Sequence, residues 1–292
     1  MEMNINASTQ ICGLIGNPVG HSVSPVIHNN LASIYGQNLV YVPLEVPEGR
    51  LEDAIKGADA CRILGMNVTV PYKSDVIPFL NSIDPLAEKI GAVNTLVREE
   101  SGYRGYNTDM PGLYWAMISD GVEVAGKDVI LLGAGGVARA VALLLLEKGA
   151  KHIYIMNRTL ERADNIAEEI NGYADREFAT PMGLKDYPVL QNGSKYLAIQ
   201  ATNVGMFPKT EEAVIEDEDF YKMIEVGYDI IFNPMDTKFM KNTRMAGGKA
   251  YHGLKMLLYQ GIIAYELWNN IQVRDEDADR IYELMKKALQ KG

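Results

Sequence analysis

A glycine-rich turn stands between two apolar stretches near the middle of the chain. Residues 129–132 read as a buried strand and residues 137–146 as a helix. Glycine at position 133 permits a tight turn, and glycine at position 135 lets the backbone approach a pyrophosphate. The free N–H groups and the dipole at the helix start would hold the phosphates. The pattern predicts a dinucleotide site formed by Gly133, Ala134, Gly135, Gly136, Val137 and Ala138.

The next predicted strand, residues 152–156, indicates which dinucleotide is bound. A site for NAD usually places an acidic residue about 20 residues after the glycines, where it accepts from the ribose 2′-hydroxyl. Here Asn157, Arg158 and Thr159 stand at the strand end, with Arg162 one turn further on. Because a cation suits a 2′-phosphate, the sequence predicts NADP. The alternative is a solvated Arg158 at the start of a surface helix capped by Thr159.

Polar residues in the first third of the chain include two hydroxyls that could bind an anion. Ser22 and Ser24 precede a predicted helix over residues 25–35, so their hydroxyls suit either a carboxylate or ordinary helix capping. Asn67 and Thr69 alternate with apolar residues and project to one face of a predicted strand over residues 66–70.

Lys73 follows that strand at its carboxyl end, where α/β proteins place ligands. By itself Lys73 also fits a plain surface lysine. Asp109 likewise fits a helix cap ahead of Pro111. The residue types alone leave both alternatives open.

Composition limits the classes of protein that the chain can belong to. With 292 residues it is long enough for two domains. The net charge of −10, without a block of Lys and Arg, argues against a nucleic-acid partner or a lipid surface. Cys12 and Cys61 lack metal-ligand spacing, so we expect no metal and no disulfide framework. Apolar runs are too short for a membrane span and no signal core stands at the start, so we expect a cytoplasmic protein.

Strand-like and helix-like stretches alternate along the chain, which predicts an α/β fold with mostly parallel sheets. The dinucleotide unit is expected to have strands near residues 128–132, 152–156, 196–200 and 227–232. Two long helices are predicted over residues 254–269 and 275–289, and we expect them to return to the first domain. The expected strands of the first domain are residues 11–16, 39–46, 66–70 and 92–98, with helical stretches at 25–35, 48–56, 72–80 and 85–90.

These features together resemble the shikimate dehydrogenase family, NADP-dependent enzymes of aromatic amino acid biosynthesis. The motifs that carry the resemblance are residues 20–25 with His28 and Asn29, residues 65–73, residues 91–95, residues 105–109, the glycine turn with residues 157–159, and residues 253–257 with Gln260. The resemblance implies an α/β substrate domain (residues 1–110 with 250–292) and a Rossmann NADP-binding domain (residues 111–249), with a cleft between them.

The resemblance also implies roles for individual residues. Lys73 would donate the proton in the reduction, with Asp109 as its catalytic partner. The implied substrate-binding set is Ser22, Ser24, Asn67, Thr69, Lys73, Asn94, Asp109 and Gln260. The implied contacts to the nicotinamide half of the cofactor are Thr202, Asn203, Gly205, Met206 and Gly253. Gly205 and Met206 also fit a loop turn and a core residue.

Two positions depart from the family pattern. Phe232 occupies the end of the predicted strand 227–232, where the family commonly has Tyr. Gln200 stands where the family usually carries Asn or a small polar residue. Both departures bear on substrate preference or affinity rather than on the fold.

The predicted function is the reversible, NADPH-dependent reduction of 3-dehydroshikimate to shikimate. One alternative is an enzyme that prefers quinate or accepts both substrates, with NADP or NAD. An alternative of another class is a non-catalytic sensor that binds NADPH. The expected partners are a small-molecule substrate and, at most, a second copy of the chain.

Overall fold

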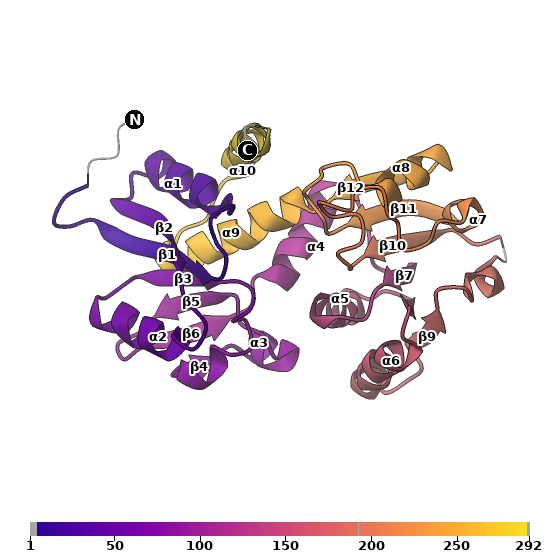
Figure 1. Cartoon of the computed structure of the whole chain (residues 1–292), viewed down its shortest axis with the longest axis horizontal. Helices are drawn as coiled ribbons and strands as arrows, with labels where there is room; N and C mark the ends of the chain where they lie inside the picture. The colour runs from indigo at the N-terminus through magenta and orange to yellow at the C-terminus, as the bar shows by residue number, and fades with distance from the viewer. Residues whose placement is uncertain (1–4, 192, 291–292) are drawn as a thin grey trace. The chain divides into compact units, whose positions relative to one another are not determined.

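The computed structural model describes residues 5–191 and 193–290, and its chain divides into two compact units. The first unit comprises Met1–Gly112 and Leu257–Gly292, and the second comprises Leu113–Met256. Residues 1–4 and 291–292, which the predicted substrate domain includes, lie outside the described residues. The unit boundaries fall within two helices, α4 (Asp109–Ser119) and α9 (Leu254–Asn269), and each unit is built around one sheet (Figure 1).

The sheet of the first unit has the strand order β2-β1-β3-β5-β6-β4. Strands β1 and β2, β1 and β3, and β4 and β6 pair in parallel, whereas β5 runs antiparallel to β3 and β6. The strands are β1 (Gln10–Gly16), β2 (Leu39–Glu45), β3 (Gly65–Val68), β4 (Ser82–Ile83), β5 (Thr95–Arg98) and β6 (Tyr103–Tyr106). The helical elements are α1 (Ser24–Ile34), α2 (Leu51–Ala60), η1 (Ile77–Phe79), α3 (Pro85–Ile90) and α10 (Asp275–Leu289).

The carboxyl-terminal end of α9 is hydrogen-bonded to this first sheet. Trp268 is buried and its indole Nε1 donates to the backbone oxygen of Leu96 in β5 at 2.9 Å. Such a bond fixes the helix in register with the strand, because a buried indole N–H needs an acceptor. The same helix carries Gln260, so its position relative to the sheet is set by packing that the sequence pattern does not reveal.

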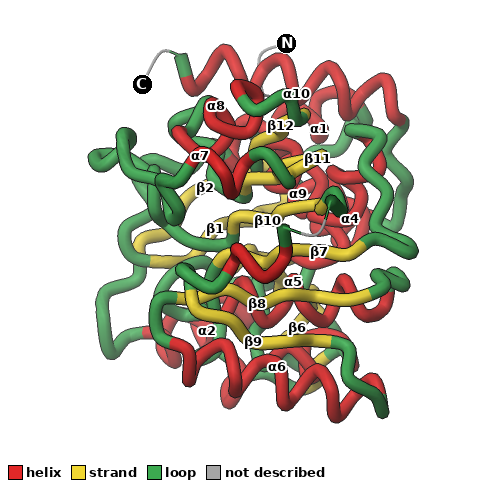
Figure 2. Tube along the Cα trace, turned by 90° about the vertical axis from the view of Figure 1, so that its right-hand side faces the viewer, coloured by secondary structure: helices red, strands yellow, loops and turns green. Residues whose placement is uncertain are grey.

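The sheet of the second unit has six parallel strands in the order β12-β11-β10-β7-β8-β9, as Figure 2 shows. This is the doubly wound order, in which the strand order reverses between β7 and β10 while all the strands stay parallel. The strands are β7 (Asp128–Leu132), β8 (His152–Asn157), β9 (Ala179–Gly183), β10 (Tyr196–Gln200), β11 (Ile224–Asp229) and β12 (Lys249–His252). The helical elements are α5 (Gly136–Glu147), α6 (Leu160–Ala174), η2 (Tyr187–Leu190), α7 (Glu218–Tyr221) and α8 (Lys238–Met245).

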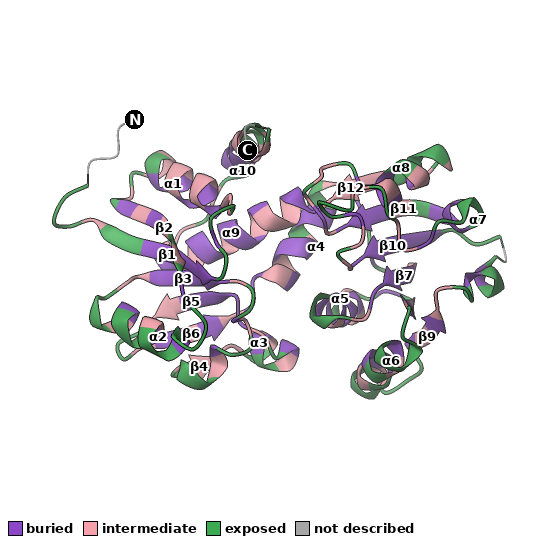
Figure 3. Ribbon diagram, viewed as in Figure 1, coloured by how far each residue is buried: buried purple, intermediate pink, exposed green. Residues whose placement is uncertain are grey.

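The two central strands of this sheet are buried almost throughout, as the colouring of Figure 3 shows. Val129, Ile130, Leu131 and Leu132 are all fully buried, which is typical of a parallel strand covered on both faces. In such sheets, ligands bind outside the carboxyl ends of the strands where the order reverses. The topology therefore points to the loops that follow β7 and β10.

The α/β class with two mostly parallel sheets is confirmed, and α9 and α10 have the predicted bounds. Several local predictions are wrong. Strand β3 ends at Val68, so Thr69 lies in the following turn and not on the strand. Strand β11 covers Ile224–Asp229 instead of 227–232, so Phe232 lies beyond it. Residues 72–80 form turns and the short η1, and β4, β6, β9 and β12 were not predicted. Short strands carry too few alternating positions to be recognised by period alone.

Candidate active site

An ion pair between Lys73 and Asp109 lies at the carboxyl end of β3. The ammonium Nζ is 2.7 Å from Oδ2 of Asp109, and the side chains are 31% and 24% exposed. Backbone hydrogen bonds fix both partners. The oxygen of Lys73 accepts from the N–H of Val93, and the side chain of Asn107 accepts from the N–H of Asp109 at the start of α4. The pair is thus half-buried, oriented and reachable by a ligand.

Asn107, not Asp109, supplies the cap of α4. Its Oδ1 accepts from the N–H of Asp109 at 3.1 Å and from that of Met110 at 3.4 Å. Its Nδ2 donates to the backbone oxygen of Ala92 at 3.0 Å. Because the helix start is satisfied by Asn107, the carboxylate of Asp109 is available to Lys73. The capping alternative for Asp109 is therefore wrong.

Two of the predicted substrate ligands belong to a buried polar network. Asn67 accepts at Oδ1 from the hydroxyl of Tyr41 at 2.8 Å and donates from Nδ2 to Oγ1 of Thr95 at 3.1 Å. Asn94 accepts at Oδ1 from the backbone N–H of Thr108 at 2.7 Å. Asn67 and Asn94 are nearly fully buried, so these bonds hold each amide in one orientation. Tyr41, on β2, was not predicted, because only the strand pairing brings it beside Asn67.

Ser22 and Ser24 lie together at the start of α1. The hydroxyl of Ser22 donates to that of Ser24 at 3.1 Å and accepts from the N–H of Ser24 at 3.2 Å. The N-cap position of α1 is Val23, which has no side-chain cap, so the prediction of Ser24 as the cap is wrong. Burial raises the pKa of Tyr41 well above its ordinary value, and a hydrogen bond to the Ser24 side chain opposes this. The serine pair therefore adjoins the polar network.

Thr69 and Gln260 are less directly connected to the ion pair of Lys73 and Asp109. Thr69 is half-buried, and its backbone N–H donates to the oxygen of Ile15 at 2.9 Å. Gln260 is buried and its Nε2 donates within α9 to the oxygen of Leu257 at 2.9 Å. A Cβ at Gly112 would come within 2.7 Å of the Gln260 backbone, so α4 and α9 pack closely there. Within the described residues, no hydrogen bond joins either side chain to Lys73 or Asp109.

The glycine turn lies at the carboxyl end of β7, at the point where the strand order reverses. Gly133 has a φ of 114°, which favours glycine, and a Cβ there would meet the Thr202 side chain at 2.7 Å. Gly135 is the N-cap of α5 in an extended conformation, and a Cβ at Gly135 or Gly136 would meet no protein atom within 4 Å. The protein itself does not require glycine at these two positions, whereas a phosphate resting on the helix start would. Ala138 is fully buried beneath them.

Arg158 and Arg162 project from the loop after β8 and the first turn of α6. Both are exposed, and among residues 5–191 and 193–290 neither guanidinium has a hydrogen-bond or ion-pair partner. Asn157 donates from Nδ2 to the backbone oxygen of Thr159, which shapes this loop. Thr159 is the N-cap residue of α6 but makes no capping side-chain bond. Two free cations beside the next strand suit a phosphate group.

The segment after β10 forms the other side of the switch point. Thr202 is half-buried and Gly205 buried, with a φ of 91° that favours glycine, whereas Asn203 and Met206 are exposed. The core alternative for Met206 is therefore wrong. Further along the chain, a Cβ at Gly253 would meet the oxygen of Ile230 at 2.0 Å, so packing alone requires glycine there.

Sequence reasoning missed a buried carboxylate next to this segment. Asp229, at the end of β11, is fully buried, and burial raises its pKa to about 6 while bonds from Thr237, Ile231 and Gln200 oppose the shift. An acid inside the predicted strand 227–232, whose other residues are glycine or apolar, is the signal that could have found it.

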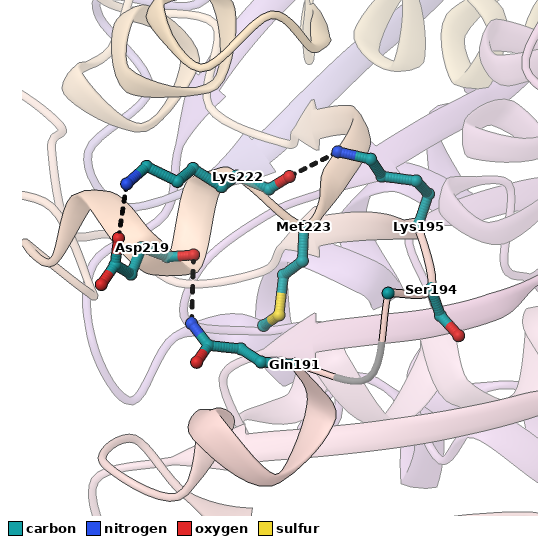
Figure 4. A pocket seen from close by; sticks show the side chains of 7 residues that line it. Gln191, Ser194, Lys195, Asp219, Lys222 and Met223 are labelled. Carbon is teal, nitrogen blue, oxygen red and sulfur yellow. Dashed lines mark hydrogen bonds and ion pairs between the residues drawn. The ribbon is translucent and has the colours of Figure 1, made fainter.

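Two surface hollows lie away from these groups. One, of about 230 Å³, is lined at the amino ends of β10 and β11 by Lys195 and Met223, with Lys222 paired to Asp219 (Figure 4). The other, of about 590 Å³, borders the loops that follow β1, β2 and β3 and includes Tyr72. Neither lining contains a predicted site residue.

A doubly wound sheet with a glycine turn at its switch point, joined to an α/β unit that carries a lysine–carboxylate pair, defines a dinucleotide-dependent oxidoreductase. The comparisons with known proteins narrow this class. The family model described as the shikimate dehydrogenase substrate binding domain matches residues 14–96, and the one described as shikimate / quinate 5-dehydrogenase matches residues 117–183. The chain belongs to the shikimate dehydrogenase family, which confirms the resemblance seen in the motifs.

Individual relatives match along nearly their whole length. The shikimate dehydrogenase (NADP(+)) of Carboxydothermus hydrogenoformans is 40% identical over 287 residues, which cover 98% of this chain and 99% of the relative. A crystal structure of a shikimate dehydrogenase in complex with NADP+ is similar with a TM-score of 0.85, 36% identity, and 99% and 97% of the two chains covered. The shikimate 5-dehydrogenase of Listeria monocytogenes in complex with shikimate and NAD has a TM-score of 0.89, 30% identity, and 98% and 99% coverage.

Proposed function

We propose that this chain catalyses the reversible reduction of 3-dehydroshikimate to shikimate with NADPH, a step of aromatic amino acid biosynthesis. The observation that carries the proposal is the ion pair of Lys73 and Asp109, 2.7 Å apart and half-buried at the carboxyl end of β3. The proposal assigns substrate binding to the unit with that pair and cofactor binding to the unit with the glycine turn. NADP is the cofactor named for the Carboxydothermus hydrogenoformans relative.

The residues around the glycine turn fit this cofactor. Gly135 and Gly136 leave room above the start of α5, where backbone N–H groups and the helix dipole bind phosphate. Arg158 and Arg162 supply two cations beside the adjacent strand, where a 2′-phosphate would lie. The segment with Thr202, Asn203, Gly205 and Met206, together with Gly253, remains the proposed surface for the nicotinamide half.

The chemistry divides between the cofactor and this chain. NADPH supplies the hydride that reduces the ketone carbon. Lys73 donates a proton from Nζ to the carbonyl oxygen as negative charge develops there, and takes it back in the oxidation direction. Asp109 holds the ammonium in place and accepts a hydrogen bond from a neighbouring substrate hydroxyl. The half-buried setting strengthens both interactions relative to open water.

The remaining polar groups would orient the substrate. Ser22 and Ser24 bind its carboxylate near the start of α1, where the helix dipole favours negative charge. Asn67, Thr69, Asn94 and Gln260 offer amide and hydroxyl groups that donate and accept, which suits a ring with several hydroxyls. The network that fixes Asn67 and Asn94 supports this role, because a preorganised amide loses little freedom on binding.

The test is steady-state oxidation of shikimate and of quinate, each with NADP+ and with NAD+, followed by the absorbance of the reduced cofactor. The proposal requires the highest kcat/KM with shikimate and NADP+. A preference for quinate or NAD+ would instead assign the chain to the quinate branch, and Phe232, which replaces the usual Tyr, would be the first position to exchange. Folded protein that binds NADPH without any turnover would support a sensor.

No described helix is long and apolar enough to cross a membrane. The small-molecule partners of the proposal are NADP and shikimate. A cytoplasmic location and a monomeric or homodimeric state remain predictions.

A further inference from the structure

A buried carboxylate joins two loops at the carboxyl edge of the second sheet. Asp229 ends β11 and lies opposite Gln200, the last residue of β10. Its Oδ1 accepts from Nε2 of Gln200 at 3.2 Å and from the N–H of Ile231 at 3.0 Å. Its Oδ2 accepts from the hydroxyl of Thr237 at 2.6 Å. One oxygen thus serves the segment after β10, and the other serves the start of α8.

The side-chain amide of Gln200 forms hydrogen bonds with the loop that follows β10. Its Oε1 accepts from the N–H of Thr202 at 2.7 Å and from the Thr202 hydroxyl at 2.5 Å. Its Nε2 donates to the oxygen of Val204 at 3.1 Å as well as to Asp229. An ionised carboxylate only accepts, so Nε2 must face Asp229 and Oε1 must face Thr202. The charge on Asp229 therefore sets which way the amide points.

This orientation of the amide holds the loop of residues 202–204 in one conformation. The Thr202 hydroxyl donates to Gln200 and accepts from the N–H of Val204 at 3.1 Å, so both of its roles are assigned. The Thr202 methyl lies against Gly133, where a Cβ would come within 2.7 Å. The loop is thereby held against the glycine turn, at the point where the strand order reverses.

We propose that Gln200 and Asp229 are positioning residues that preorganise residues 202–205 to receive the nicotinamide half of the cofactor. This inference rests on the proposed function, because that function makes the segment a cofactor surface. It assigns a role to Gln200, one of the two positions that depart from the family pattern. The longer side chain of glutamine reaches both the loop after β10 and Asp229 on the neighbouring strand. It also explains why a buried acid is kept in a strand that hydrophobic residues would fill more cheaply.

The direct test compares Gln200→Met with Thr237→Val. Methionine keeps the length of Gln200 but removes its bonds to Thr202, Val204 and Asp229. The control removes another bond to the same carboxylate and leaves the loop bonds intact. For Gln200→Met we expect the Kd of NADPH, measured by fluorescence titration, to rise at least about tenfold while the KM of shikimate stays within about twofold. For Thr237→Val we expect a lower Tm and a Kd near wild type.

The proposal is overturned if Gln200→Met binds NADPH like wild type, or if Thr237→Val weakens binding equally for the same loss of Tm. Amide hydrogen exchange of the wild-type protein, without cofactor, supplies a test that needs no variant. The N–H groups of Thr202 and Val204 must be protected, and rapid exchange at both contradicts preorganisation. NADPH binding and amide exchange are measured separately from shikimate turnover, so this inference and the proposed function fail independently.

Discussion

Lys73 and Asp109 meet at 2.7 Å although one lies in the turn after β3 and the other begins α4. Each backbone is tied separately, Lys73 through Val93 and Asp109 through Asn107. The distance therefore does not depend on the ion pair alone. A single ion pair that is still reached by solvent contributes little to stability. An arrangement that the fold maintains at small energetic benefit is better explained by the reaction than by stability.

Replacement of Lys73 by methionine should lower kcat for shikimate oxidation by about 10²- to 10⁴-fold, the usual contribution of a general acid or base. NADPH affinity and Tm should stay close to wild type. Stopped-flow absorbance measures the rate and fluorescence titration measures the affinity. Lys56→Met is the matched control, because that lysine of the same unit is exposed and pairs with Glu52 on its own helix, α2. Near-normal turnover of Lys73→Met would exclude the proposed proton donor.

Replacement of Asp109 by asparagine should leave α4 intact, because Asn107 caps the helix through the backbone. Asparagine can still accept from Lys73 at Oδ1, but the negative charge opposite the ammonium is lost, which we expect to cost about 1.5 kcal/mol, or roughly 10-fold in kcat/KM. We also expect a higher KM for shikimate, since the carboxylate is proposed to grip a substrate hydroxyl. A variant with lower Tm and unchanged kcat/KM would show a purely structural role.

Replacement of Arg158 by alanine should raise the KM of NADP+ by roughly 10- to 100-fold, the factor expected for a charge-assisted bond of about 1.5–3 kcal/mol. The KM of NAD+ should change by less than about twofold, because NAD+ lacks the 2′-phosphate. Arg176→Ala serves as the control, since Arg176 lies beyond the opposite end of α6, over the Phe178 ring. An equal effect on both cofactors would contradict the assignment of Arg158.

Features that depend on neighbouring residues in the chain can be predicted well from the sequence. Contacts that depend on which strands pair cannot. The glycine turn and the long helices α9 and α10 follow from short-range rules of backbone freedom and period. The contact of Tyr41 with Asn67 depends on β1 pairing with both β2 and β3, which no local pattern states. The same holds for Gln200 and Asp229, which become neighbours only through the register of β10 and β11.

Strand ends were the weakest prediction at the site. Apolar residues continue after Asp229 as far as Phe232, but the backbone leaves the sheet at Asp229, whose carboxylate accepts hydrogen bonds from Ile231 and Thr237. Likewise Thr69 continues the alternation of β3, and its N–H donates to the oxygen of Ile15, the residue of β1 that pairs with Val68, but β3 itself ends at Val68. In both places the side-chain pattern continues beyond the last residue of the strand.

The buried imidazole of His28 predicts a loss of stability in acid. Burial lowers its pKa to about 3, although Asn67 acts in the opposite direction, and the ring stacks on Tyr41 at 4.1 Å. Because the unfolded chain binds this proton at the ordinary pKa near 6.5, the free energy of unfolding should fall as pH drops from about 6.5 towards 3. His28→Phe should reduce that slope by up to about one proton, measured by urea denaturation between pH 4 and 7.

The titration of Asp229 changes the free energy of unfolding with the opposite sign to that of His28, over part of the same pH range. Its pKa is raised to about 6 by burial, so the folded protein holds this proton more tightly than the unfolded chain does. The contribution of Asp229 to stability therefore falls as pH rises from about 4 to 6 and stays low above that. Two pKa units correspond to about 3 kcal/mol. The Asp229→Asn variant lacks this pH-dependent contribution. The difference between its free energy of unfolding and that of the wild type should therefore increase by about 3 kcal/mol between pH 4 and 7. A constant difference across this range would mean that Asp229 titrates alike in the folded and unfolded chain.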